Sequence, residues 1–328
     1  MIMRLGRDFT NLLNTSFLTE EEKKLLKEGK IAVSDMDAKV QIKSKRDIIN
    51  QIKVAKETGL DHVELDGGIP NPFLEMSAAE IRAGRDFSEK NGITLSLHIP
   101  YTFVCASTAA FQESDRVMAV EMIKKYLNVA GELGCNNVVM HPGAVPFYQT
   151  LGEYGKMVLR SVVKSLLEIV PLAEKKKLSF HLENNTAFDG VAFEIPECLE
   201  IIKEVNAKGH NVKFCFDIGH WFTRVDVNLK VHNPPESILN EIPNGIFSQV
   251  HLNDYIPVVK KFHPPLHYQK GLLKKENLVN LIRKLARKGA SLIVVETAVR
   301  EVDELLNARE LMDAESKYLR EVFKDAEV

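Results

Sequence analysis

The stretch LSFHLENN, residues 178–185, and its counterpart VKFCFDIGH, residues 212–220, carry the clearest structural signal in this chain. Each contains a short run dominated by apolar side chains, which is typical of a strand that is buried on both faces. Each run ends in a carboxylate, Glu183 in the first and Asp217 in the second. The helical pattern between them indicates two parallel strands joined by a crossover helix.

The same alternation of short apolar runs and longer helical patterns extends through most of the chain. Ser77 with Glu80 three residues later is a capping box that starts one of the helices, and Gly92 is suited to end it. Eight strand–helix units favour an α/β protein with a closed (β/α)8 TIM barrel over an open sheet. The strands are predicted at residues 30–33, 62–65, 93–98, 137–141, 178–183, 212–217, 246–251 and 292–296.

Residues 1–29 precede the first predicted strand and contain a capped helical segment at 19–28. They are predicted to form an N-terminal extension with one helix that covers the bottom or edge of the barrel. Residues 30–328 are assigned to a single catalytic barrel domain, because no linker composition interrupts them. The Pro-rich segments 233–235 and 257–265 are expected to be loops near the site.

Composition narrows the class of protein. The 328-residue chain has a formal net charge of -2 and no concentrated basic field, so nucleic acid is not an expected partner. Its four cysteines form no C-x-x-C pair, and the reduced state expected for them indicates a cytoplasmic protein. No apolar run approaches the roughly 18 residues that a membrane span needs, and the amino terminus lacks a signal-peptide pattern.

Seven of the predicted strands end in a side chain that can ionise or bind a metal. Neighbouring members of this set are 34 to 45 residues apart, one strand–helix unit each. In a barrel this common phase places all of them at the carboxyl-terminal rim, where enzymes of this fold hold their chemistry. One such residue alone is more often a helix cap or a loop hydrogen-bonder, whereas seven in phase indicate a shared ligand. The set consists of Glu64, His98, His141, Glu183, Asp217, His251 and Glu296.

The ligand that this set predicts is a divalent metal ion. Burying several carboxylates and imidazoles together is costly unless a cation pairs with them. Nitrogen and oxygen donors of this kind bind Zn, Mn, Co or Mg.

Six strings between residues 59 and 297 resemble the motifs of the xylose-isomerase-like TIM barrel superfamily, which contains sugar isomerases, sugar epimerases and type IV apurinic endonucleases. The strings are LHIPY, MHPG, LENN, FDIGH, VHLND and VVET. The resemblance to the isomerase and epimerase branch implies one divalent ion, and it implies that the two glutamates among its ligands also move protons. The implied ligands are Glu183, Asp217, His251 and Glu296.

The endonuclease branch holds three zinc ions and uses further ligands. The residues of this chain that match them are His98, His141 and His220. Its third ion also requires an Asp-x-His pair shortly after the H-x-N-D string, whereas here that region offers only the dipeptides that end in His263 and His267. The sequence therefore leaves the third ion open, with His263 or His267 as a replacement ligand or as a substrate contact.

The interpretation we favour is an isomerase or epimerase of a sugar, sugar phosphate or related polyol ketone, acting by proton transfer through a metal-stabilised enediolate. Glu183 is expected to remove the proton, and Glu296, or Glu183 itself, to return it. The alternative is an endonuclease IV-like, metal-dependent phosphodiesterase that acts on abasic DNA. A barrel that only binds a ligand is the third class, but binding alone needs no pair of carboxylates.

Substrate contacts are predicted mainly at the same rim. The expected partner is a small carbohydrate, membrane is not expected, and a homo-oligomer stays open. His62 and His181 lie two residues before Glu64 and Glu183, so strand alternation places them one layer below, where they could orient the ligands. The predicted substrate-binding residues are Glu64, His98, His141, His220, Trp221, His263 and His267.

Overall fold

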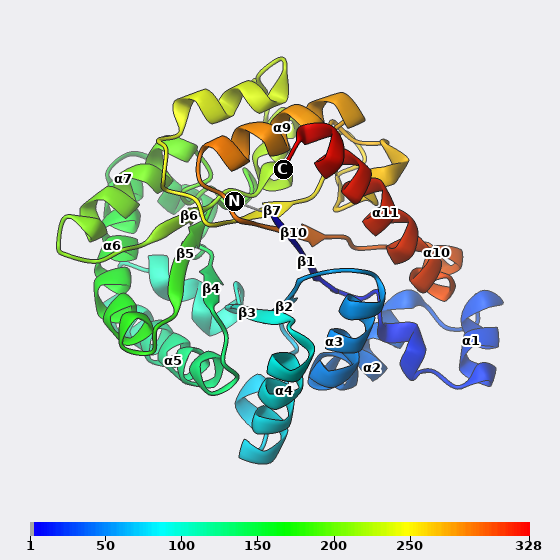
Figure 1. Ribbon diagram of the computed structural model, residues 1–328. Coiled ribbons are helices and arrows are strands. Elements are labelled where there is room, and N and C mark those ends of the chain that lie inside the picture. Colours follow the sequence, from blue (N-terminus) through cyan, green and yellow to red (C-terminus); the bar gives the residue numbers. More distant parts are fainter. Residues whose placement is uncertain (1–2) are drawn as a thin grey trace.

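Eight parallel strands form one sheet in the order β6-β5-β4-β3-β2-β1-β10-β7. The computed structural model, which describes residues 3–328, shows these strands around a common axis with the helices outside them (Figure 1). The predicted TIM barrel is therefore confirmed. The strands are β1 Arg4–Asp8, β2 His62–Leu65, β3 Thr94–His98, β4 Asn137–Met140, β5 Ser179–Glu183, β6 Lys213–Cys215, β7 Gln249–Leu252 and β10 Leu292–Glu296.

The helices follow the strands along the chain and cover the outside of the barrel (Figure 1). The capping box at Ser77 and Glu80 forms as predicted, and Gly92 ends the same helix in the left-handed conformation that glycine adopts easily. The helices are α1 Glu20–Lys27, α2 Val33–Arg46, α3 Ile48–Glu57, α4 Ala78–Asn91, α5 Glu113–Glu132, α6 Gly152–Lys175, α7 Ile195–Asn206, α8 Ile218–Phe222, α9 Lys275–Arg287, α10 Val302–Leu306 and α11 Ala308–Ala326.

The first barrel strand is not where the sequence predicted it. Residues 30–32 form an irregular bend between α1 and α2, and α2 begins at Val33, so the strand prediction at 30–33 is wrong. The first strand is instead β1, which pairs with β10 on one side and with β2 on the other. The segment 1–29 thus supplies a barrel strand in addition to the predicted helix, which forms as α1.

Strand β1 was hidden because three of its five residues are charged, and the partners of its two arginines lie far away in the sequence. Arg4 donates to the hydroxyl of Thr94 on β3 (3.2 Å). Arg7 is 1% exposed and pairs with the buried carboxylate of Glu315 on α11 (2.9 Å). Gly6 leaves room for His62, since a Cβ at this position would lie 2.8 Å from the Cβ of His62. A buried charge is tolerated when it is paired, and these partners are remote in sequence.

The barrel closes between β6 and β7, and few backbone hydrogen bonds join these two strands at this seam. Among residues 3–328, the bridge that joins these two strands is formed by Asp217 and His251, just beyond the end of β6. Two backbone hydrogen bonds accompany it, from Phe214 N to Ile246 O (3.0 Å) and from His251 N to Phe216 O (3.2 Å). Two residues that the sequence predicts as metal ligands therefore lie at the point where the barrel closes.

Two further expectations from composition concern the cysteines and the membrane. All four cysteines are buried and free of disulfide bonds. No helix within the described part of the chain combines the length and apolar character needed to cross a bilayer.

Candidate metal centre

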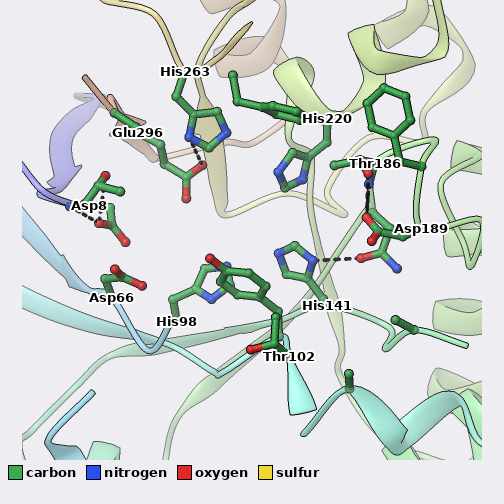
Figure 2. A pocket seen from close by; sticks show the side chains of 18 of the residues that line it. Asp8, Asp66, His98, Thr102, His141, Thr186, Asp189, His220, His263 and Glu296 are labelled. Carbon is green, nitrogen blue, oxygen red and sulfur yellow. Dashed lines mark hydrogen bonds and ion pairs between the residues drawn. The ribbon is translucent and has the colours of Figure 1, made fainter. Parts of the chain in front are cut away.

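The side chains predicted at the carboxyl ends of the strands converge on one buried rim. Figure 2 shows His98, His141, His220, His263 and Glu296 turned toward the same cavity. The remaining members of the predicted set lie just beneath them and are 0–1% exposed: Glu64, Glu183, Asp217 and His251. All seven strand-end residues are therefore brought together.

Glu183, at the end of β5, lies at the centre of the rim and is contacted by four histidines. Its Oε2 atom lies 3.0 Å from Nε2 of His98 and 3.2 Å from Nε2 of His141. Its Oε1 atom lies 3.0 Å from Nδ1 of His251 and 3.4 Å from Nδ1 of His220. One carboxylate thus faces imidazoles from four separate elements of the fold.

Asp217 and Glu296 are held together by Asn253, which follows β7. The Nδ2 atom of Asn253 donates to Oδ2 of Asp217 (2.6 Å) and to Oε2 of Glu296 (2.9 Å). Glu296 also reaches Nδ1 of His251 with its other oxygen, at 3.3 Å. The amide therefore fixes the spacing of two carboxylates that would otherwise repel each other.

The short helix α8 sets the position of His220. Asp217 caps this helix, because its Oδ1 atom accepts from the backbone N–H of His220 (2.6 Å). Gly219 permits the tight turn between them, since a Cβ there would lie 1.6 Å from Oδ1 of Asn253. The FDIGH string therefore builds both a predicted ligand and the turn that presents the next one.

The donor atoms form five overlapping groups in which every ligand atom lies within 4.8 Å of the others, and three of them lie side by side along the histidines of the rim. The first group consists of His98, His141 and Glu183; the second of Glu183, Asp217 and His251; and the third of Asp217, His220 and His263. Imidazole and carboxylate donors at this spacing suit divalent ions such as Zn, Mn or Co. The residues present therefore fit the cofactor that the sequence predicts.

The hydrogen bonds of three histidines agree with this fit. Nδ1 of His98 can donate to the carbonyl oxygen of Ile99 (2.9 Å), and Nδ1 of His141 can donate to Oδ1 of Asn185 (2.8 Å). Nδ1 of His220 can donate to the carbonyl oxygen of Asn184 (3.0 Å). An imidazole that donates through Nδ1 keeps the Nε2 lone pair for a metal, which is the usual arrangement around ligand histidines.

The sequence left open whether His263 or His267 joins the site, and the residue that lies at the rim is His263. It follows β9 Lys261–Phe262, which pairs with β8 Tyr255–Ile256 in a small hairpin, and it reaches the group of Asp217 and His220. Its buried Nε2 atom has no hydrogen-bond partner among residues 3–328. Burial lowers the pKa of His263 to about 4, so its imidazole is neutral and can act as a ligand.

The two glutamates predicted to move protons have opposite pKa shifts. Burial would raise the pKa of Glu183, but the nearby imidazoles of His251 and His141 outweigh it and hold the pKa well below its ordinary value. Burial raises the pKa of Glu296 well above its ordinary value, and the carboxylates of Asp217 and Glu183 add to that effect. The site thus holds one ionised carboxylate beside one that favours its proton.

Three of the predicted substrate contacts, Glu64, Trp221 and His267, are not among the residues that line the cavity. Glu64 lies beneath the rim, where its carboxylate accepts from Ser96 (2.6 Å) and pairs with Nε2 of His251 (2.7 Å). Trp221 follows His220 by one helical step, which turns it into the core against Phe222.

His267 is the third of these residues. It lies in a 3₁₀ turn that is tied to α11 by a hydrogen bond from Leu266 N to Glu315 (2.6 Å). The histidines of the layer below, His62 and His181, are fully buried as strand alternation predicted. Burial lowers the pKa of His62 to about 3 and that of His181 to about 4.

A cavity of about 690 Å³ opens above the rim, and its inner wall is acidic. Asp8 and Asp66 point into it together with Glu296 (Figure 2). Asp66 is paired with the buried amine of Lys45 (2.9 Å). Asp8 lies close to the carboxylates of Glu64 and Glu296, and burial, with Asp66 and Glu64, raises its pKa well above the ordinary value.

Sequence reasoning missed Asp8 and Asp66 as part of the site. Asp8 was overlooked because strand β1 was not recognised, although a side chain that can ionise or bind a metal at the end of a strand was the signal used for the other seven residues. Asp66 was interpreted as part of an ordinary turn with the glycines that follow it. Three asparagines that orient the predicted ligands lie within the LENN and VHLND strings, but the sequence did not indicate this role for them: Asn184, Asn185 and Asn253.

Comparison with known proteins places the fold in a family. A family model described as Xylose isomerase-like TIM barrel matches residues 52–322. A crystal structure of D-psicose 3-epimerase from Clostridium cellulolyticum H10 has a TM-score of 0.68 and covers 99% of both chains, at 15% sequence identity. At that identity the likeness concerns the fold.

Two sequence relatives match part of the chain. An uncharacterized protein of Methanocaldococcus jannaschii is 31% identical over 182 residues, which are 55% of this chain and 57% of that protein. A probable endonuclease 4 of Bacillus licheniformis is 26% identical over 183 residues, which are 53% of this chain and 56% of that protein. The matched segments thus span little more than half the length of these relatives.

Proposed function

Since the chain belongs to the xylose isomerase-like TIM barrel family, we propose that it is a divalent-metal-dependent isomerase or epimerase of a sugar, sugar phosphate or related polyol ketone. The observation that carries the proposal is the placement of two buried glutamates against one imidazole. Nδ1 of His251 lies 3.0 Å from Glu183 and 3.3 Å from Glu296. Two carboxylates that enter one rim from different strands suit the removal of a proton and its return at another carbon or face.

In this proposal each residue of the rim has a separate task. A divalent ion held by Glu183, Asp217, His251 and Glu296 would make the C–H beside a carbonyl group more acidic. Glu183 accepts that proton on a carboxylate oxygen, and Glu296 or Glu183 returns it. His98 and His141 then bind hydroxyl groups of the substrate at the inner end of the cavity.

The lining of the cavity favours an uncharged polyol over a phosphorylated one. Asp8, Asp66 and Asp189 line it together with Glu296, whereas Arg300 is the sole Lys or Arg among the described residues at its wall. Carboxyl groups exchange hydrogen bonds with sugar hydroxyls, whereas a phosphate group is usually bound through several Lys or Arg side chains. An unphosphorylated ketose or aldose is therefore the first substrate class to test.

A metal-dependent phosphodiesterase acting on abasic DNA remains the second candidate, because one specific observation favours it. His98, His141, His220 and His263 complete donor groups on both sides of the central one, so the rim offers ligands for up to three ions. Against this candidate stands the acidic cavity wall, since proteins that bind nucleic acid contact phosphates mainly through Lys and Arg.

Isotope exchange tests the proposed reaction directly. The chain loaded with Mg²⁺ or Mn²⁺ is expected to introduce solvent deuterium at the carbon beside the carbonyl group of a ketose, because its glutamates exchange protons with water between turnovers. The measurement is proton NMR of a panel of ketoses and aldoses in D₂O, with a parallel assay on an abasic-site duplex. Cleavage of the duplex without exchange in any sugar would overturn the proposal in favour of the phosphodiesterase.

The substitution His141→Ala distinguishes the two candidates through the number of bound ions. In the isomerase, His141 binds substrate, so the variant is expected to keep one tightly held ion and to lose about tenfold in substrate affinity. In the phosphodiesterase, His141 is one of three protein ligands of an ion, so the variant loses that ion. Elemental analysis of dialysed wild type and variant measures the difference, and a count that falls by one contradicts our assignment.

A further inference from the structure

The outer part of the cavity has a lining that proton transfer at the rim does not require. Four aromatic side chains line the cavity: Tyr101, Phe103, Phe188 and Phe262. Three of them are exposed, Phe103 to 76%, Tyr101 to 44% and Phe188 to 38%, whereas the glutamates of the rim are buried. The exposed aromatic part of the lining is called the mouth of the cavity.

Phe103 is held at the mouth at a conformational cost. It starts the 3₁₀ segment Phe103–Ala109 with a φ of 53°, in the left-handed region that bulky residues rarely adopt. Its side chain is 76% exposed, although a large apolar ring would normally be buried. Strained backbone and exposed apolar surface both concentrate at binding sites. The two features together indicate that this ring contacts a ligand.

Phe188 and Phe262 form a second aromatic surface that is built by two separate loops. Phe188 lies after β5 and Phe262 belongs to β9, and their rings meet edge to face with centroids 6.1 Å apart. The ring of Phe262 is supported by Tyr255 (5.0 Å), and the amine of Lys260 lies 4.9 Å from the ring of Phe188. These contacts orient the pair, while Phe188 stays 38% exposed.

The aromatic mouth is continuous with the metal centre. The ring of Tyr101 stacks on His141 with centroids 5.0 Å apart and an interplanar angle of 25°. The same ring meets His98 edge-on at 5.5 Å. The whole cavity of about 690 Å³ lies within the range of roughly 300–1,000 Å³ that suits drug-sized ligands, which is more space than one monosaccharide needs.

We infer that the substrate is a polyol with a second, flat apolar part, and that Phe103 and Phe188 bind this second part while the polyol lies at the rim. The inference rests on the proposed function for the identity of the polyol end. The C–H face of a second sugar ring and an aromatic aglycone both present a flat apolar surface that stacks on aromatic side chains. Either source satisfies the shared chemistry, and the test separates them.

Ligand binding to the Mg²⁺-loaded full chain tests the inference. The probes are glucose, galactose and mannose, their p-nitrophenyl glycosides, and the disaccharides cellobiose, lactose and maltose, measured by calorimetry or by ligand-observed NMR. At least one probe with a second ring is expected to bind about tenfold or more tightly than its parent monosaccharide. Preference for p-nitrophenyl glycosides identifies an aromatic aglycone, and preference for disaccharides identifies a second sugar.

Matched variants test whether the aromatic side chains at the mouth of the cavity cause the higher affinity for probes with a second ring. Phe103→Ser and Phe188→Ser are expected to bring the affinity for ring-bearing probes down to that for the monosaccharide. Phe103→Tyr keeps the ring and is expected to bind as wild type does. Phe147→Ser removes another exposed phenylalanine, 69% exposed and outside the cavity, and is expected to change nothing. Circular dichroism confirms that each variant folds.

The inference is overturned if no ring-bearing probe binds more tightly than its parent, or if both serine variants retain the full gain. The proposed function is judged separately, by deuterium exchange into monosaccharides. Exchange that persists in both serine variants while the gain is absent leaves the isomerase proposal standing and refutes only the aromatic subsite. A gain that depends on Phe103 in a protein without exchange supports the subsite and refutes the isomerase.

Discussion

Replacing Glu183 by glutamine is expected to lower turnover by at least about 10³-fold while the barrel stays folded, because general acid–base groups contribute about 10²–10⁴-fold and the proposed function also gives this residue a place among the metal ligands. An amide cannot accept the substrate proton. It also carries no negative charge to balance that of the bound divalent ion. Since the amide has nearly the same shape as the carboxylate, the packing beneath the rim is preserved.

The control for this variant is Glu310→Gln on the exposed surface of α11. Both variants are compared with wild type for thermal unfolding, bound metal and deuterium exchange into the best sugar. Activity at the wild-type level in Glu183→Gln, with the ion still bound, would refute the assigned proton transfer. Loss of the ion together with the activity would be consistent with a ligand role, and added metal ion then separates the two contributions.

Removal of divalent ions by a chelator is expected to abolish activity and to lower the thermal unfolding midpoint. Without a cation, three carboxylates of the rim remain buried together, and only the imidazoles and Asn253 offset their repulsion. A ligand present at a thousandfold excess over its dissociation constant stabilises the folded state by about 4.1 kcal/mol. The three carboxylates are Glu183, Asp217 and Glu296.

Readdition of Mn, Co, Zn or Mg is expected to restore both the activity and the unfolding midpoint. The extent of recovery with each ion shows which metal the site prefers. Protein dialysed without chelator serves as the control for handling losses. Full turnover in protein with no measurable bound ion would contradict the central assignment, whatever the sugar.

Much of the barrel could be predicted because its signal is local. Seven of the eight strands lie at apolar runs, and their last residues share one phase, so the ring of ligands followed from spacing alone. Strand β1 could not be predicted in this way. Its arginines bind the hydroxyl of Thr94 and the carboxylate of Glu315, which lie far away in the sequence, and no local pattern reveals such partners.

The loops could be predicted only in part. Spacing could not separate His263 from His267, because the choice depends on the hairpin of β8 and β9 that turns one toward the rim. It also could not reveal the aromatic mouth, since Phe103 and Phe188 carry no periodic pattern and are brought together only by the folded loops. Positions in regular elements were therefore predictable, whereas side chains that depend on loop conformation were not.

The seam between β6 and β7 would link the affinity for a cation to the local unfolding of the barrel. Asp217 and His251 form both the bridge that closes the barrel and part of the central donor group. If these two residues ligate the ion as proposed, opening of the seam separates two ligands at once, so a bound ion opposes the opening. Chelation of the ion is then expected to speed hydrogen exchange of the backbone amides along this edge of the barrel.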